Sequence, residues 1–166
     1  MPGPDFSLVF PPDPVWVRSA REAVRALLRS ARRDDLTDTA LLLTSEAVTN
    51  AVNACHSSGC SIPVTLSAEW TGRRTPTDTG AVTGTGAVTD PATTHGTNPG
   101  PSPAAPDSCA TLRVLVHDFA PGLPAGRAAE GGDESGRGLA LIGDCATDWG
   151  VRPAGAGPGK AVWFEL

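Results

Sequence analysis

The chain has 166 residues, of which 40% are hydrophobic, so it is long enough for one domain with a single core. Its formal net charge of −5 argues against a general nucleic-acid binder, a class that is normally basic. No run of about 18 apolar residues occurs, which excludes a membrane-spanning helix.

Hydrophobic periodicity and turn residues predict strands and helices in the order βααββαββ. Asp13 is expected to cap the first helix, with Pro14 as its first residue. Asp35 or Thr37 caps the second helix, which ends before Gly59. The predicted elements are residues 6–10, 14–33, 37 to about 54, 61–70, 112–117, 136 to about 147, 149–152 and 161–166. This order predicts a two-layer α+β sandwich, with a mixed, mostly antiparallel sheet and its helices on one face.

Residues 71–110 differ in composition from the rest of the chain. They contain ten Thr, six Gly and six Pro, and no Leu, Ile, Phe, Trp or Met. Such a segment buries too little apolar surface to offset the entropy lost on ordering. We expect a disordered insertion in a surface connection, so that residues 1–166 form one domain interrupted at this point.

The second predicted helix carries polar side chains on one face. Glu46 and Asn50 are four residues apart, which places their Cβ atoms roughly 5–6 Å from each other, and Asn53 lies on nearly the same stripe. The neighbouring residues are apolar, and a buried carboxylate or amide is costly unless it is paired. One interpretation is a site in which Asn50 offers oxygen to magnesium and Glu46 acts as a base. The alternative is the exposed polar stripe of an ordinary amphipathic helix.

Two further features lie in the second half of the chain. Asp118 follows a predicted strand where a Gly/Pro loop begins, and it either contacts a ligand or caps its own loop. Gly136 and Gly138 open the third helix, where free backbone N–H groups can hold a polyphosphate, unless the glycines are only a flexible joint. Residues 154–161 are not a P-loop, because the first glycine and the Ser/Thr are missing and a strand follows.

The order of these features resembles a known family. Glu-x-x-x-Asn on a helix, Asp after a strand and Gly-x-Gly at a later helix are similar to the histidine-kinase-like ATPase superfamily, also called the GHKL or Bergerat fold. Within it, the chain resembles stand-alone ATP-binding regulators related to anti-sigma-factor serine/threonine kinases. The resemblance covers residues 6–70 and 111–166. Residues 46–52 are similar to the family's N-box and 136–141 to its second glycine box.

The resemblance implies ATP and Mg²⁺ as cofactors and suggests a role for each site residue. Asn50 would ligate the metal, Glu46 would be the general base, and Asp118 would accept a hydrogen bond from the adenine amino group. The glycines of the later box would let the backbone approach the phosphates, under a mobile lid at 119–135. The full set of nucleotide-binding candidates is Asn50, Asn53, Asp118, Gly122, Gly136, Arg137, Gly138 and Leu139.

Besides a simple ATPase, two functions remain open from the sequence. The first is a protein serine/threonine kinase that phosphorylates an antagonist protein, and Glu46 at the base position favours it. The second is a non-catalytic, ATP-gated module that sequesters a sigma factor or another partner. Ala120, in place of the first glycine of the family's Asp-x-Gly-x-Gly box, and Asn53, in place of a basic side chain, favour the second. The resemblance also allows a homodimer and places either function in transcription regulation, without direct nucleic-acid or membrane contact.

The N-terminal residues suggest a location for the protein. They lack the cationic and apolar regions of a signal peptide, so we expect a cytoplasmic protein. Its four cysteines are then expected to be reduced thiols.

Overall fold

The computed structural model describes residues 5–72, 110–122, 134–153 and 158–166. The predicted order of elements is confirmed, with one short 3-10 helix, η1, added before the second helix. The elements are β1 (Phe6–Phe10), α1 (Trp16–Ser30), η1 (Asp34–Leu36), α2 (Thr37–Ser58), β2 (Val64–Thr71), β3 (Thr111–Asp118), α3 (Glu134–Cys145), β4 (Asp148–Pro153) and β5 (Lys160–Glu165).

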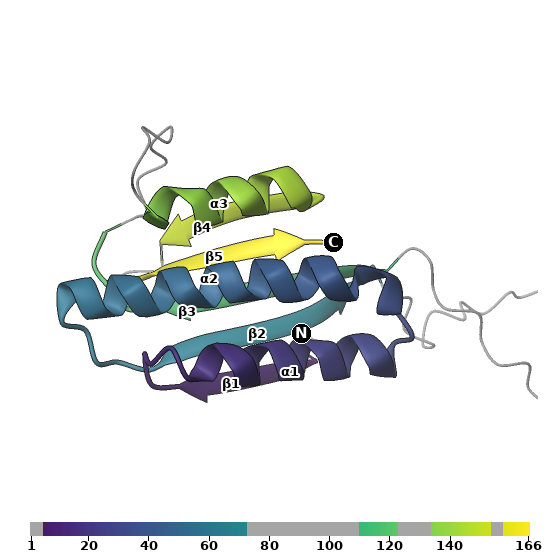
Figure 1. Ribbon diagram of the computed structural model, residues 1–166, viewed down its shortest axis with the longest axis horizontal. Helices are drawn as coiled ribbons and strands as arrows, with labels where there is room; N and C mark the ends of the chain where they lie inside the picture. The colour runs from purple at the N-terminus through teal and green to yellow at the C-terminus, as the bar shows by residue number, and fades with distance from the viewer. Residues whose placement is uncertain (1–4, 73–109, 123–133, 154–157) are drawn as a thin grey trace, which may run out of the picture.

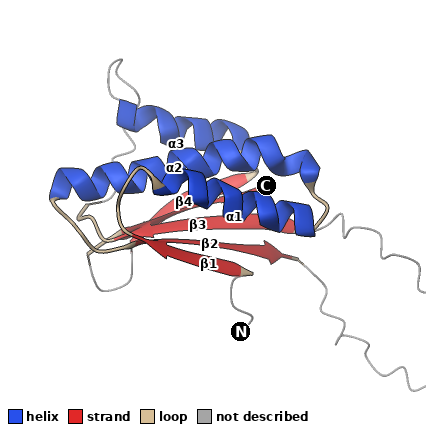
Figure 2. Ribbon diagram, turned by 60° about the horizontal axis from the view of Figure 1, so that its bottom comes forward, coloured by secondary structure: helices blue, strands red, loops and turns tan. Residues whose placement is uncertain are grey.

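The strands form one five-stranded sheet in the order β1-β2-β3-β5-β4. Every neighbouring pair is antiparallel, so the predicted α+β sandwich is confirmed while the sheet is not mixed. The sheet contains no parallel pair because β5 lies between β3 and β4, two strands that run in the same direction. The helices all lie on one face of the sheet (Figure 2).

The core lies between this helical layer and the sheet. Side chains on β2 and β3 alternate between buried and half-buried, as expected for strands with one covered face. The long helix α2 lies along the middle of the sheet, with α1 on one side of it and α3 on the other (Figure 1). Nine of its residues are buried, including Leu43, Val48 and Val52. Each fully buried Val or Leu contributes about 1.5–3 kcal/mol. Most of the apolar residues beside the polar face of α2 are therefore core residues.

The first helix begins later than predicted. It starts at Trp16, and Pro14 lies in the preceding turn. The Asp13 carboxylate accepts a hydrogen bond from the Val15 N–H at 2.9 Å, and the Asp13 carbonyl accepts one from the Trp16 N–H at 3.1 Å. Asp13 thus organises the turn that leads into the helix.

The second helix ends before Gly59, as the sequence predicts, but it continues past residue 54 to Ser58, and Gly59 is left-handed. Gly59 has φ +68°, and the next N–H, of Cys60, donates to the Cys55 carbonyl at 2.9 Å. This is the Schellman arrangement, which satisfies carbonyls at the helix end. Cys60 packs against the core cluster that includes Cys55.

The central strands β2 and β3 form a hairpin whose connection is the predicted insertion. Thr71 and Thr111 are opposite each other at its end, and the Thr71 hydroxyl donates to the Thr111 carbonyl at 3.2 Å. The predicted insertion, 71–110, therefore starts too early, because Thr71 completes β2. Residues 73–109 lie outside the described part of the chain. None of the helices among the described residues is both long and apolar enough to cross a membrane.

Candidate functional site

The side chains of Glu46 and Asn50 meet at the backbone of Gly138, where α2 packs against α3. A Cβ added to Gly138 would lie 2.7 Å from Asn50 Nδ2 and 2.9 Å from Glu46 Oε2, closer than real Cβ atoms approach other heavy atoms. Gly138 is buried, and the two polar residues are half-buried. A larger residue here would therefore displace the ends of the Glu46 and Asn50 side chains, which occupy the space beside the glycine.

Asn50 has an unmet hydrogen-bonding requirement. Its Nδ2 is buried and has no partner among the described residues. Leaving a buried donor unpaired costs about 1–3 kcal/mol, so a bound group that accepts from Nδ2 would stabilise this site. The opposite atom of the amide, Oδ1, is the type of hard oxygen that magnesium prefers.

The residues beside Gly138 fit a magnesium ion that is bound by the protein and by a phosphate group together. No group of three or more His, Cys, Asp or Glu side chains suited to a metal occurs in the described ranges. A self-contained metal cage is therefore not built from those residues. Magnesium typically takes only one or two protein oxygens and completes its shell with water and phosphate, and Asn50 Oδ1 suits this role.

Asp118 is the last residue of β3 and is only 1% exposed. Its Oδ1 accepts a hydrogen bond from the Ala120 N–H at 3.0 Å and another from Lys160 Nζ at 2.9 Å. The first of these bonds is the local loop cap that the sequence left as one alternative. The second joins the ends of two adjacent strands through a buried ion pair.

Lys160 is the site residue that the sequence analysis missed. In the sequence Lys160 belongs to residues 154–161, which are not a P-loop, and it directly precedes the predicted closing strand 161–166. One signal could have found it, because Lys160 is the only lysine in the chain and it begins an apolar closing strand. A charged residue in such a strand is rarely buried without a partner.

A cavity of about 330 Å³ opens between the C-terminal half of α2, the end of β3, α3 and β5. It brings together five predicted residues and Lys160. The predicted residues that line it are Asn50, Asn53, Asp118, Gly122 and Leu139. Glu46 does not line this cavity but lies one helical turn from Asn50. The structure does not describe the side chain of Arg137.

The third helix begins at Glu134, two residues earlier than predicted. The first four N–H groups of a helix have no intrahelical acceptor, and Gly136 is among these residues. Gly138 is the fifth residue, so the prediction that it helps to open the helix is wrong. Its contribution is instead the missing side chain that admits Glu46 and Asn50.

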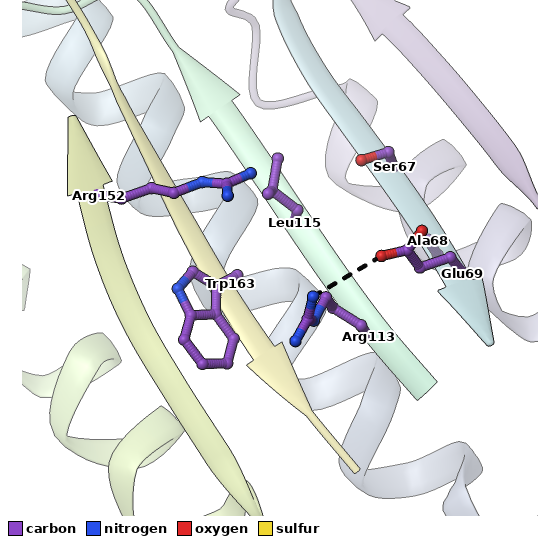
Figure 3. A pocket seen from close by; sticks show the side chains of 7 residues that line it. All are labelled: Ser67, Ala68, Glu69, Arg113, Leu115, Arg152 and Trp163. Atoms are coloured by element: carbon purple, nitrogen blue, oxygen red, sulfur yellow. Dashed lines mark ion pairs between the residues drawn. The ribbon is translucent and has the colours of Figure 1, made fainter. Parts of the chain in front are cut away.

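A larger cavity, of about 470 Å³, lies on the opposite face of the sheet (Figure 3). Its most prominent side chain, Arg113, is already partnered. Arg113 Nε donates to Glu165 Oε1 at 2.7 Å, and the guanidinium carbon lies 5.4 Å from the centre of the Trp163 ring. None of the predicted site residues lines this cavity, so we assign the functional site to the smaller one.

The thiol of Cys55 is buried close enough to Asp118 and Lys160 for their charges to affect its pKa. Burial, and after it the negative charge of Asp118, raises the pKa of this thiol from 9.0 to about 11. The positive charge of Lys160 acts in the opposite direction. Cys55 is therefore a protonated core residue close to the carboxylate end of the cavity.

Comparison with known proteins identifies the family. A family model described as histidine kinase-like ATPase domain matches residues 10–165. The chain belongs to this family. The superfamily resemblance is thereby confirmed, and this histidine kinase-like ATPase domain is an ATP-binding domain. No curated protein matches the chain. The match runs from the end of β1 to the end of β5 and so includes every element that lines the smaller cavity.

Proposed function

We propose that this chain is an ATP-dependent protein serine/threonine kinase of the anti-sigma-factor type, which phosphorylates an antagonist protein in transcription regulation. One observation carries the proposal: Glu46 and Asn50 meet at Gly138, beside the cavity that Asp118 and Lys160 line. A carboxylate without a salt-bridge partner among the described residues stands next to a potential metal ligand. Such a carboxylate can take up a proton.

The site is elongated along α2, which suits a nucleoside triphosphate. The residues of α2 that line the cavity run from Asn50 to Ser58, a rise of about 12 Å at 1.5 Å per residue. Asp118 would lie at the base end of the site and Glu46 at the phosphate end. In this arrangement Asp118 accepts from the base and Asn50 faces the phosphates.

Glu46 would act as the general base. It accepts the proton of a serine or threonine hydroxyl as the hydroxyl oxygen bonds to the γ-phosphorus and the bond from that phosphorus to the ADP oxygen breaks. A positioned base contributes about 10²–10⁴-fold to such a step. Bound magnesium would offset the charge of the phosphates, and Asn50 Oδ1 is the ligand that this chain offers to it.

A non-catalytic module that sequesters a sigma factor is the second candidate. Ala120 favours it, because this residue is 1% exposed and its N–H is bonded to Asp118. The first residues of the loop after β3 are therefore held by a hydrogen bond, at the position where the family's first glycine box has a glycine. Such a protein would still bind ATP but would transfer no phosphate.

Two measurements test these proposals. Calorimetry with magnesium-ATP at concentrations up to millimolar tests binding. Incubation with ATP radiolabelled on its terminal phosphate, together with candidate antagonist and sigma proteins, tests transfer. Label on a partner serine or threonine that disappears in Glu46→Gln supports the kinase. ATP-dependent sigma-factor binding without label supports the sequestering module, and the absence of any heat or thermal shift with ATP overturns both.

A further inference from the structure

The ion pair of Asp118 and Lys160 has more hydrogen-bonding capacity than the protein uses. The lysine side chain is 6% exposed and the aspartate side chain 1%. An ammonium group carries three donors, and Asp118 takes one of them. No other described residue accepts from Nζ. Burying a charged group with donors unused is costly, so these donors point to a ligand.

The aspartate has a matching free acceptor. Both of its hydrogen bonds to described residues, from Ala120 and Lys160, end on Oδ1. Oδ2 accepts none within the described part of the chain. An acceptor, Asp118 Oδ2, and a donor, Lys160 Nζ, are therefore both available on residues that line the same cavity.

The backbone fixes the two residues side by side. Asp118 and Lys160 are partners in the β3–β5 register. The preceding residue, Gly159, has φ +120°, and a Cβ there would lie 2.4 Å from the Asp118 carbonyl oxygen. Only glycine permits this approach, so the position of the ammonium relative to the carboxylate is set by the main chain.

We infer that Lys160 is a specificity-determining residue that reads the nucleotide base together with Asp118, an inference that rests on the proposed function. The ligand class is a 6-aminopurine, whose amino donor is adjacent to the ring-nitrogen acceptor N1. Asp118 Oδ2 accepts from the amino group, and Lys160 Nζ donates to N1. The opposite charges of the pair cancel, so this wall of the cavity suits a neutral base.

The test compares ATP with 1-deaza-ATP, in which a C–H group replaces N1, on the wild type and on Lys160→Met. The wild type should bind ATP about 10- to 100-fold more tightly than 1-deaza-ATP, the range expected for a hydrogen bond from a charged donor. In Lys160→Met the two ligands should bind within about threefold of each other. A purely structural lysine would lower both affinities equally and leave their ratio unchanged.

Arg152→Met is the matched control. Arg152 is an exposed basic residue on β4 and lines the opposite cavity, where Figure 3 shows it extending toward Leu115. Its replacement should preserve the wild-type ratio of the two affinities.

The possible results distinguish a failure of the role of Lys160 from a failure of the proposed function. ATP binding with an unchanged ratio in Lys160→Met overturns the role of Lys160 and leaves the proposed function intact. If Lys160→Met does not fold, the wild type alone decides, because equal affinities for the two nucleotides contradict the contact to N1. A wild type that binds neither nucleotide overturns the proposed function and this inference with it.

Discussion

Glu46 and Asn50 approach the same point in space from adjacent turns of α2. Glu46 Oε2 and Asn50 Nδ2 lie 2.9 and 2.7 Å from the position that a Cβ on Gly138 would occupy. The two side chains are thus neighbours with different chemistry, since one is an ionisable carboxylate and the other a neutral amide. Their substitutions should therefore have different effects.

Glu46→Gln should keep magnesium-ATP affinity within about threefold and lower phosphotransfer by about 10²–10⁴-fold, because the amide retains the shape but cannot take the proton. Asn50→Ala should weaken magnesium-ATP binding about 10- to 100-fold through loss of an oxygen ligand. Calorimetry and a transfer assay on the same preparations check both. Full turnover in Glu46→Gln would show that the carboxylate is structural.

Gly138→Ala should disturb the site without unfolding the protein. The new methyl group displaces Glu46 and Asn50, so magnesium-ATP binding should fall at least tenfold. Gly143→Ala is the control on the same helix, because its Cβ would meet the Trp149 side chain at 3.1 Å, and that side chain is 38% exposed and can shift. Both changes raise helix propensity by about 1 kcal/mol. Equal nucleotide affinities in the two variants would contradict the packing seen at Gly138.

Local features were predictable from the sequence, and contacts between distant segments were not. Glu46 and Asn50 could be placed on one face because helical spacing is fixed within the segment. The bond from Lys160 to Asp118 depends on the register of β3 with β5 across 42 residues, which no local pattern encodes. The close packing of Gly138 depends in the same way on how α3 lies on α2. The start of α1 was misplaced because Asp13 and Pro14 are equally suited to a turn.

Cys55 should resist alkylation in the native protein. The thiolate is the reactive form, and burial together with Asp118 raises the pKa of this thiol to about 11. Among the three cysteines that the structure describes, iodoacetamide at pH 8 should modify the exposed Cys145 first and the buried Cys55 last, as followed by peptide mass spectrometry. In urea, Cys145 and Cys55 should be alkylated at similar rates. Rapid native labelling of Cys55 would mean that the end of α2 opens.

The raised pKa of Cys55 also predicts that the stability of the folded protein decreases at alkaline pH. The folded state favours the neutral thiol, so this group's contribution to stability is complete below pH 9 and is lost as the pH rises toward 11. The urea midpoint should fall over this window, and Cys55→Ala should reduce the slope. A fall of equal size in the variant would assign the effect to other groups.

Replacing residues 73–109 with a short Asn-Gly turn should preserve the fold and nucleotide affinity. The ends of this segment leave the sheet next to each other, at Thr71 and Thr111, so a tight turn can join them. The cavity lies at the other end of β3, about 23 Å away, since seven intervals of roughly 3.3 Å separate Thr111 from Asp118. Thermal melting and ATP titration check the result, and a large fall in melting temperature would show that the segment packs on the domain.

The adjacency of β2 and β3 also matters while the chain is being synthesised. β2 emerges from the ribosome before residues 73–109, and its partner β3 emerges after them. At about 5–20 residues per second, this delay is roughly 2–7 s. During that interval the edge of β2 that β3 will cover has no strand to pair with, and an unpaired edge is a template for association with other chains. The segment between the strands therefore sets how long the nascent domain remains prone to aggregation.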